Sequence, residues 1–341
     1  MDALCQIAWE ETNCPLCGQR REKVLLETRP KADHPPYRVV QCGVCEMGYL
    51  NPRPTPETVG LLYPDNYECY QPRGESGREP GWKRYCEQLV WSRCYGYPPP
   101  LRSWYERLLA RMVRPWFGPS RDSMTAIPYT GKGRLLDFGC GAGWLLTRMK
   151  ERGWSVAGLD FSSYTAQRVQ KRLQIPVYVG TLPHPEIAAE SFDVVTMGAV
   201  LEHVHDPHAV ISGAARILAE NGLIVISVPN IASCQFDWFQ EDCWSLELPR
   251  HLLHFSPATI TRLVRMHGFE VVQLRLLGRT SWMRRSVEAA LARPKHKWWL
   301  RAARLRPIAS LLTSWTVFRG RSDCLMLIAR KVGKNQQRCS A

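Results

Sequence analysis

Four cysteines near the start of the chain have the spacing of a metal site. Cys14 and Cys17 form one Cys-x-x-Cys pair, and Cys42 and Cys45 form a second pair after 24 intervening residues. Each pair can make a tight turn in which both thiolates face one ion, and two pairs complete a tetrahedral site. Because four protein ligands leave no open position, the sequence predicts a structural zinc ion rather than a catalytic one.

A glycine-rich stretch and a later aspartate have the chemistry of a nucleotide site. Gly139, Gly141 and Gly143 follow a predicted strand, where glycines let backbone N–H groups approach a ligand and a helix N-terminus favours negative charge. Asp160 ends the next predicted strand, and its carboxylate can accept hydrogen bonds from both hydroxyls of a ribose. A dinucleotide fingerprint would need a small residue where Trp144 stands, so nicotinamide and flavin cofactors are disfavoured.

Two histidines follow predicted strands and could accept a proton. His203 lies in the run from Val200 to Pro207, after the fourth predicted strand, and His251 lies in the segment after the fifth. Open parallel sheets bind ligands at the carboxyl ends of their strands, so both imidazoles are expected near the reaction centre. A neutral imidazole titrates near physiological pH and is a credible base. The alternative is that His203 only caps or packs the following helix, and the choice between the two histidines stays open.

Alternating strand and helix patterns must position these residues. Strands are predicted at 134–138, 155–160, 177–179, 192–197, 223–228, 269–276 and, after a long interruption, 323–330. Helices are predicted at 144–151, 162–173, 207–218 and 256–267. The third helix is expected to stop at Asn221-Gly222. This alternation predicts an α/β fold with a seven-stranded, mostly parallel, doubly wound sheet that carries helices on both faces.

The glycine stretch from Leu135 to Leu146 resembles the first motif of the class I S-adenosylmethionine-dependent methyltransferases, and Asp160 resembles their ribose-binding acid. The resemblance covers roughly residues 131–276 and resumes at 323–330. It implies that the glycine loop, starting at Asp137, cradles the methionine part of S-adenosylmethionine. The cofactor-binding residues that it implies are Asp137, Gly139, Gly141, Gly143, Asp160, Phe161, Thr181 and Leu182. The alternative is an ordinary helix turn of another doubly wound protein.

Two of these implied contacts concern the adenine. Phe161 would lie against the ring, and the turn with Thr181 and Leu182 would flank its edge. The family often has an acid in that turn, and its absence here implies that the contacts come from the backbone.

The run around His203 resembles a segment of small-molecule methyltransferases, the quinone O-methyltransferases among them. Those enzymes also carry a Glu four positions before the histidine, tied to a divalent metal, and Ala199 at that position argues against a metal-assisted mechanism. The run around His251 is similar to the His-x-x-x-Phe-Ser segment of the same group. Arg250 replaces the Glu that sugar C-methyltransferases have there, which favours O-methylation over C-methylation, and Arg250 could bind an acidic acceptor. His254, with apolar neighbours, is expected to be structural.

The chain divides into segments of different composition. The predicted organisation is a zinc ribbon at 1–50, a proline-rich and aromatic connecting helical segment at 51–130, a core at 131–278, a basic helical insertion at 279–322, the last core strand at 323–331 and a tail at 332–341. The ribbon and the segment after it resemble the N-terminal module of sugar and natural-product methyltransferases. Tyr67 or Tyr70 could reach the acceptor. The stretch 235–239 and Trp244 are expected to line the acceptor pocket or, alternatively, to pack in the core.

The net charge of +14 is concentrated near the end of the chain. Residues 279–338 hold fifteen Lys and Arg and two acids, so the remainder is close to neutral and a nucleic-acid partner is less favoured. Trp residues among basic and apolar ones at 279–321 are typical of an interfacial membrane segment. The alternatives are an RNA-binding surface and a solvated helical cap.

Thirteen cysteines, an odd number, do not indicate a disulfide framework. The absence of a leader and of a membrane-length apolar run predicts a cytoplasmic protein, peripheral on the inner face of the membrane.

These observations predict an enzyme that transfers a methyl group from S-adenosylmethionine to a small molecule, with oxygen the favoured target and a lipid-linked acceptor the finer hypothesis. A zinc-ribbon ribosomal RNA methyltransferase is the first alternative, and salt-dependent retention of RNA would distinguish it. A non-catalytic zinc-binding scaffold is the second, and failure to bind S-adenosylmethionine would distinguish that.

Overall fold

The computed structural model describes residues 6–27, 38–64, 80–118, 124–293 and 299–333. The two tyrosines expected to reach the acceptor, Tyr67 and Tyr70, lie outside these ranges, as does Trp298 of the basic insertion.

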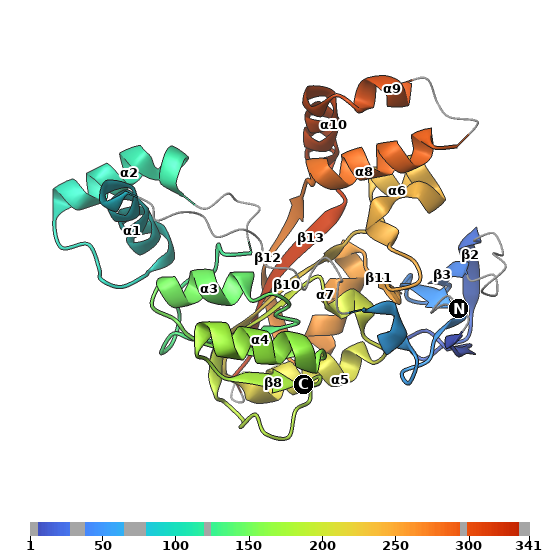
Figure 1. Ribbon diagram of the computed structural model, residues 1–341, viewed down its shortest axis with the longest axis horizontal. Coiled ribbons are helices and arrows are strands. Elements are labelled where there is room, and N and C mark those ends of the chain that lie inside the picture. Colours follow the sequence, from blue (N-terminus) through green and yellow to red (C-terminus); the bar gives the residue numbers. More distant parts are fainter. Residues whose placement is uncertain (1–5, 28–37, 65–79, 119–123, 294–298, 334–341) are drawn as a thin grey trace.

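A seven-stranded sheet forms the centre of the molecule (Figure 1). The strand order is β12-β13-β10-β9-β6-β7-β8, and only β13 runs antiparallel to its neighbours in it. The strands are β6 (Arg134–Phe138), β7 (Ser155–Asp160), β8 (Val177–Val179), β9 (Phe192–Gly198), β10 (Leu218–Pro229), β12 (Phe269–Leu277) and β13 (Cys324–Lys331). The predicted mostly parallel, seven-stranded sheet is confirmed, and this order is that of the class I methyltransferase fold.

Four core helices of the described chain lie between the strands, and three of them begin at a polar side-chain cap. They are α3 (Trp144–Glu151), α4 (Ser163–Leu173), α5 (Pro207–Ile217) and α7 (Pro257–Met266). The Ser162 hydroxyl accepts a hydrogen bond from the Thr165 N–H at the start of α4, and Asp206 and Ser256 cap α5 and α7 in the same way.

The predicted stop of α5 at Asn221-Gly222 is wrong, although the predicted range 207–218 agrees with the helix to one residue. The helix stops at Ile217, and Leu218 already pairs with Phe192 of β9. Asn221, in the left-handed region at φ 60°, lies where the register of β10 shifts between Leu218 and Leu223. Asn221-Gly222 therefore forms an irregularity inside β10, because burying the apolar Leu218 outweighs the helix-stop signal.

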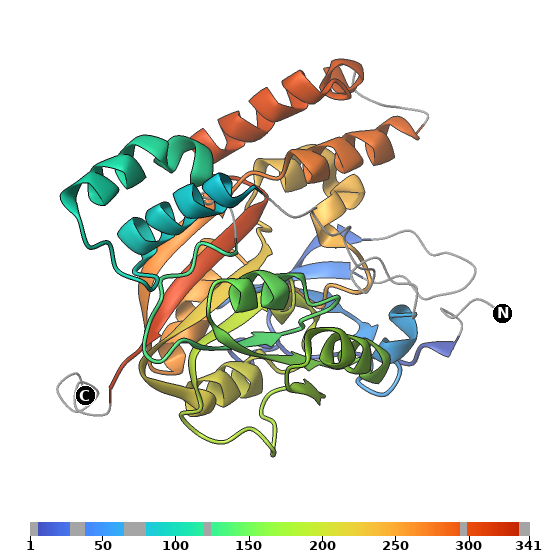
Figure 2. The same ribbon diagram turned by 60° about the vertical axis from the view of Figure 1, so that its left-hand side comes forward.

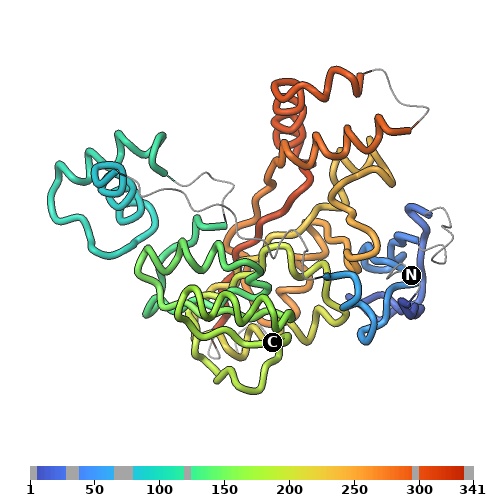
Figure 3. Tube along the Cα trace, viewed as in Figure 1, coloured from blue at the N-terminus to red at the C-terminus, as the bar shows by residue number. Residues whose placement is uncertain are grey.

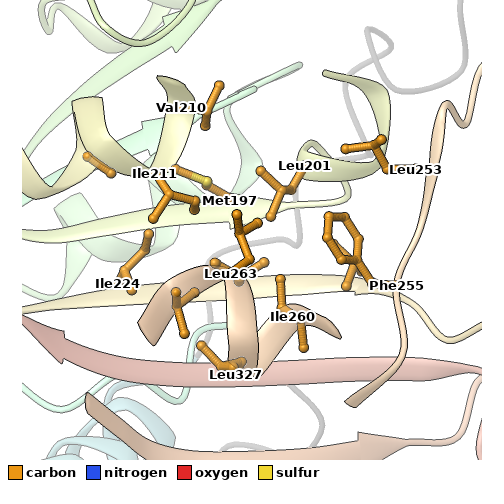
Figure 4. Packing of buried hydrophobic residues seen from close by; sticks show 14 of the residues in the cluster. Met197, Leu201, Val210, Ile211, Ile224, Leu253, Phe255, Ile260, Leu263 and Leu327 are labelled. Atoms are coloured by element: carbon orange, nitrogen blue, oxygen red, sulfur yellow. The ribbon is translucent and has the colours of Figure 1, made fainter. Parts of the chain in front are cut away.

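Two buried clusters cover the two faces of this sheet. In one, Met197 of β9 and Ile224 of β10 pack against Ile211 of α5 and Leu263 of α7, as Figure 4 shows. Each of these side chains is fully buried, which stabilises the fold by roughly 1.5–3 kcal/mol per residue. The cluster continues without interruption into the N-terminal module, where it includes Leu16.

The N-terminal module is built into the core through a shared sheet. Its elements are β1 (Trp9–Glu10), β2 (Glu22–Glu27), β3 (Arg38–Cys42), β4 (Gly48–Asn51), β5 (Arg53–Pro54) and the 3-10 turn η2 (Val59–Leu62). A four-stranded sheet has the order β11-β4-β3-β2, and its edge strand β11 (Leu253–His254) comes from the region after β10. A Cβ at Gly48 would lie 2.9 Å from the His254 carbonyl oxygen, so only glycine allows this pairing.

Two helical units extend from the core. One is a hairpin of α1 (Gly81–Tyr95) and α2 (Trp104–Phe117), which stands out from the body in Figure 3. The other joins α6 (Cys234–Phe239) to the basic insertion, which forms α8 (Thr280–Leu291), α9 (Trp299–Ala303) and α10 (Arg306–Phe318). In both Figure 1 and Figure 2 the hairpin and α10 lie on one side of the molecule, opposite α4 and α5. Among the described residues, no helix has both the length and the apolar character needed to cross a membrane.

Candidate functional site

The glycine loop joins the end of β6 to the start of α3. Gly139, Gly141 and Gly143 all have positive φ angles, of 70°, 48° and 73°. A Cβ at Gly139 would lie 2.2 Å from a methyl carbon of Val200, and a Cβ at Gly143 would lie 2.9 Å from Val169. The loop therefore needs glycine both for its backbone conformation and for its close contact with the segment after β9.

Asp160 lies beside this loop at the end of β7. Its Oδ2 accepts a hydrogen bond from the Gly141 N–H at 2.8 Å, and its Oδ1 accepts one from the Ser162 N–H at 3.0 Å. Burial raises the pKa of this carboxyl, and the two backbone donors oppose that shift. Phe161, the next residue, is half exposed. A carboxylate fixed beside a glycine loop, with an exposed aromatic ring next to it, fits the ribose and adenine of S-adenosylmethionine.

Asp137 lies under the loop at the end of β6. Its side chain is buried, and the Thr196 hydroxyl donates a hydrogen bond to its Oδ1 at 2.6 Å. Burial, with a smaller contribution from the nearby Asp160 carboxylate, raises the pKa of Asp137 to about 7. A direct contact of Asp137 with the cofactor remains a prediction.

The turn after β8 offers only one exposed side chain of the predicted pair. Thr181 is exposed, whereas Leu182 is buried in the core, against Gly213 of α5. The Gly180 N–H donates to the Asp160 carbonyl oxygen at 2.9 Å, which ties this turn to the end of β7. Contacts to adenine from Leu182 would therefore have to come from its backbone, in line with the sequence-based expectation.

The structure brings the two candidate bases together. His203 lies in the 3-10 turn η4 (Leu201–His203) after β9, and His251 precedes β11. Their ring centroids are 4.7 Å apart, with the planes at 73°. His203 is partly exposed and His251 is buried. The sequence left a choice between two separate histidines, and the fold makes them one pair.

Backbone carbonyls orient both rings through Nδ1. His203 Nδ1 lies 3.1 Å from the Arg250 carbonyl oxygen and 2.8 Å from the Tyr63 hydroxyl, and His251 Nδ1 lies 2.9 Å from the Ser245 carbonyl oxygen. Burial, with a smaller contribution from a neighbouring histidine, lowers the pKa of each of the two rings to about 3. Both imidazoles are therefore neutral at physiological pH and can accept a proton.

Glu202 is a third ionisable group in this cluster. It is fully buried, and neither carboxylate oxygen has a hydrogen-bond partner among the described residues. Burial raises the pKa of Glu202 to about 8. Ligand atoms of Glu202, His203 and His251 all lie within 4.8 Å of one another, so these three side chains have the spacing needed to hold a divalent cation.

Tyr63 is a site residue that sequence reasoning missed. Its ring centroid lies 5.7 Å from that of Phe161 and 5.8 Å from that of His203, both in edge-to-face geometry. One ring thus joins the predicted adenine side to the candidate base. The segment after the zinc module contains three tyrosines, Tyr63, Tyr67 and Tyr70. Nothing in the sequence distinguishes Tyr63 from the other two.

Arg250 is engaged within the protein. Its Nε donates to the Leu62 carbonyl oxygen at 2.9 Å, and its Nη1 lies 3.3 Å from Glu247. The guanidinium therefore joins the segment before β11 to the end of η2, and its contribution to an acidic acceptor stays a prediction. His254 is buried in β11 opposite Gly48, the structural position expected for it.

The aromatic stretch of α6 packs inside the helical cap. Phe236 and Phe239 are buried together with Met283 of α8 and Leu300 of α9. The Trp238 ring stacks on Trp315 of α10, with centroids 5.8 Å apart and planes at 19°. The sequence left open whether this stretch lines the acceptor pocket or packs in a core, and Phe236 and Phe239 pack in a core.

The four predicted zinc ligands form one cluster. The Sγ atoms of Cys14 and Cys45 lie 3.4 Å apart, those of Cys17 and Cys42 lie 3.5 Å apart, and all four lie within 4.8 Å of one another. A tetrahedral site with Zn–S distances of about 2.3 Å would place sulfurs about 3.8 Å apart. The geometry and the four thiols fit zinc with little movement.

The zinc module contacts the segment that carries His203. Arg53 donates to the His205 carbonyl oxygen at 3.0 Å, and the His205 Nε2–H donates to the Pro54 carbonyl oxygen at 2.9 Å. His208 Nε2 lies 3.0 Å from the Leu16 carbonyl oxygen, within the first cysteine turn. The module is therefore part of the frame that holds the candidate base.

Comparison with known proteins agrees with this geometry. A family model described as a methyltransferase domain matches residues 101–274. The chain is 32% identical over 140 residues to the ubiquinone biosynthesis O-methyltransferase of Psychrobacter cryohalolentis, covering 38% of this chain and 53% of that one. It is 30% identical over 166 residues to the protein of the same name from Thiobacillus denitrificans, covering 44% and 69%.

The chain spans about half the length of the first of these relatives. Among solved structures, an S-adenosylmethionine-dependent methyltransferase from Mesorhizobium loti is 20% identical and covers 60% of this chain and 94% of that one, with a TM-score of 0.42. With the family model matching half of its residues, the chain belongs to the methyltransferase domain family.

Proposed function

We propose that the protein transfers the methyl group of S-adenosylmethionine to an oxygen atom of a small-molecule acceptor. The observation that carries the proposal is the position of Tyr63, whose ring contacts both Phe161 and His203. A cofactor whose ribose is held by Asp160 would therefore lie next to the histidine pair. The related proteins are named O-methyltransferases, which supports oxygen as the target atom.

The bound cofactor supplies an electrophilic methyl group on a sulfonium. Methyl transfer from it would be an in-line displacement by the acceptor oxygen, in which the carbon–sulfur bond would break and its electron pair would stay on sulfur. The hydroxyl proton of the acceptor passes to a neutral imidazole, His203 or His251. Because the Nδ1 atom of each ring faces a backbone carbonyl, Nε2 is the nitrogen that would take that proton, and the Nε2 of His251 lies 3.6 Å from Glu247 Oε2.

The partial exposure of His203 supports a direct role in this step, whereas the buried His251 could act through the neighbouring ring. The lowered pKa of each histidine keeps the imidazole neutral at physiological pH, so it needs no prior deprotonation, and the same shift makes each ring a weak base. The step needs no metal, although a cation held by the Glu202 cluster would serve the same end by lowering the pKa of the acceptor hydroxyl.

The four cysteines would hold a structural zinc ion. With four ligands it would take no part in the reaction and would instead fix the module that positions Tyr63 and the segment after β9.

A lipid-linked acceptor is the finer part of the proposal. The helix α10 of the basic insertion exposes Leu311, Trp315 and Phe318 along one stripe, and Arg319 follows the helix directly. Such a stripe is suited to the surface of a membrane, from which a lipid-linked substrate would have to be drawn. The rest of the insertion packs on α6 as a cap.

The test is an unbiased transfer assay. Purified protein is incubated with methyl-labelled S-adenosylmethionine and cell lysate, and the mixture is divided into organic, aqueous small-molecule and RNA fractions. Label in the organic fraction supports the full proposal, and label in the aqueous fraction supports a small molecule without the lipid. Label that follows RNA contradicts the proposal in favour of a ribosomal RNA methyltransferase.

Two controls separate the remaining alternatives. The Asp160→Ala variant should transfer much less label than the unaltered protein at a cofactor concentration that just saturates the unaltered protein. Absence of S-adenosylmethionine binding in a titration of the unaltered protein would point to a non-catalytic scaffold. A chelator that stops transfer while the zinc and the cofactor stay bound would show that Glu202, His203 and His251 bind a metal ion and do not act as a proton acceptor.

A further inference from the structure

The outer helix of the α1–α2 hairpin carries large apolar side chains on its surface. Trp104 is 75% exposed, Met112 is 61% exposed and Trp116 is 76% exposed. Tyr105 and Leu108 of the same helix are also more than half exposed. Exposed apolar residues are common when scattered singly, but a contiguous group of aromatic and aliphatic side chains on one helix marks an interaction surface.

These side chains fall on one side of α2. At about 100° per residue, the exposed apolar side chains cover an arc of about 140° around the helix. The residues of this arc, called the apolar arc below, are Trp104, Tyr105, Leu108, Leu109, Met112 and Trp116. The opposite side carries the buried Ala110 and the half-buried Val113 and Phe117, and it faces α1. The apolar arc is therefore not the side by which α2 is attached.

A strip of positive charge runs along the edge of the apolar arc. Arg107, Arg111 and Arg114 are all exposed and occupy the next part of the helix circumference. Residues 81–117 as a whole contain seven Lys and Arg and two Glu, a net charge of +5. A helix with an apolar face that includes Trp, bordered by cations, has the composition of helices that lie in the interface of an anionic membrane.

The hairpin is anchored firmly at its base. Trp91 of α1 is buried against Tyr97, with ring centroids 5.1 Å apart, and the Arg152 guanidinium lies 4.0 Å from the Trp91 ring. Tyr97 packs in turn on Trp154 of the core. The anchor uses the inner helix, which leaves α2 as the outer surface of a unit that stands out from the body (Figure 3).

We propose that the apolar arc and the arginine strip of α2 bind the surface of an anionic phospholipid bilayer. The arc would enter the boundary between headgroups and acyl chains, and the arginines would pair with the phosphates. The helix α10, which exposes Leu311, Trp315 and Phe318, lies on the same side of the molecule as the hairpin (Figure 2), so the proposal allows it as a second contact with the same bilayer. This inference concerns attachment alone, and it holds or fails independently of methyl transfer.

Vesicle flotation with the full chain tests this inference. The probes are vesicles of phosphatidylcholine with and without phosphatidylglycerol. We expect the unaltered protein to float with the anionic vesicles. A Leu108→Glu/Met112→Glu variant should partition at least roughly tenfold more weakly, since charged residues replace apolar ones in the arc. Arg107→Gln/Arg111→Gln should weaken binding roughly tenfold or more on anionic vesicles alone, at about 1 kcal/mol per charge.

The control is Met266→Glu, which places one glutamate at an exposed apolar position of α7, outside the apolar arc, and should bind as the unaltered protein does. Affinity for S-adenosylmethionine, measured by titration, should be equal in all four proteins and reports that the core is folded. Failure of the unaltered protein to float, or equal flotation of the Leu108→Glu/Met112→Glu variant, would overturn the inference. So would a dimer in sedimentation equilibrium that this variant dissociates, because the arc would then bind a second copy of the chain.

Discussion

The cofactor side and the acceptor side of the central sheet are built in different ways. On the cofactor side, the glycine loop and Asp160 lie within a single strand–helix–strand unit and contact each other through the Gly141 N–H. On the acceptor side, His203 is held by Tyr63 from the N-terminal module and by the backbone of Arg250 from the segment before β11. The first side is local in sequence, and the second joins residues up to 187 positions apart.

This difference has a consequence for how the two sides respond to change. A local unit keeps its geometry as long as its own strands and glycines are present. The acceptor side depends on the zinc module, which reaches it through Tyr63 and through the contacts of Arg53 and Pro54 with His205. We therefore expect that cofactor binding and methyl transfer can be disrupted separately.

The largest effect is expected from removing a zinc ligand. Cys14→Ser should lose the bound metal and lower the free energy of unfolding by an amount on the order of several kcal/mol, since binding a structural zinc ion contributes directly to folding. Methyl transfer should be abolished while cofactor affinity changes little. Zinc content by mass spectrometry, urea unfolding and a cofactor titration give the three values.

Cys94→Ser is the control for this variant, because Cys94 is exposed on α1 and lies outside the four-cysteine cluster. Equal zinc content in Cys14→Ser and in the unaltered protein would refute the predicted site. Loss of cofactor affinity together with transfer would show that the two sides are not separable.

The converse disruption is Asp160→Ala. Losing a carboxylate that accepts hydrogen bonds from a ribose should weaken S-adenosylmethionine binding roughly tenfold to a hundredfold, as calorimetry would measure. The zinc content should not change. Glu151→Gln, at an exposed position of α3, is the matched control and should bind as the unaltered protein does. An unchanged affinity in Asp160→Ala would remove the ribose assignment.

On the cofactor side, the buried Asp137 should make the free energy of unfolding depend on pH. Its pKa rises from an ordinary 3.8 to about 7 on folding, so the folded state binds more protons between these values and stability falls as pH rises through this window. Asp137→Asn should therefore be more stable than the unaltered protein at pH 8, by an amount on the order of a few kcal/mol, and no more stable at pH 4. Urea unfolding at the two pH values measures the difference, and a gain of equal size at both would contradict the prediction.

The smallest effect is expected at the link between the sides. Tyr63→Phe keeps the ring between Phe161 and His203 and removes the hydroxyl that lies 2.8 Å from His203 Nδ1. Transfer should fall only roughly threefold to tenfold, the value of one neutral hydrogen bond, with cofactor affinity unchanged. A rate equal to that of the unaltered protein would show that the Arg250 carbonyl alone orients the ring.

The sequence predicted the parts of the fold whose signals are local. Every core strand, the helices between them and the cysteine cluster could be predicted, because period, turn residues and ligand spacing are all encoded within short segments. The role of Asn221-Gly222 could not be predicted, because the burial of Leu218 in β10 depends on pairing with the neighbouring strand β9.

The acceptor side could be predicted only in part for the same physical reason. His203 and His251 were each found from their place after a strand, yet their pairing depends on β11 joining the zinc module's sheet. The contact of Tyr63 with His203, and the absence of a hydrogen-bond partner for the Glu202 carboxylate among the described residues, both depend on the folded structure. No short segment of the sequence contains these contacts.

A single-turnover comparison of His203→Gln and His251→Gln tests the central claim most directly. Each variant is saturated with labelled S-adenosylmethionine and mixed with the fraction that accepts label from the unaltered protein. The account predicts unchanged cofactor affinity in both variants and a rate of transfer roughly 10²–10⁴-fold lower in at least one of them. Transfer at the unaltered rate in both would contradict it, because the histidine pair would then take no part in moving the proton.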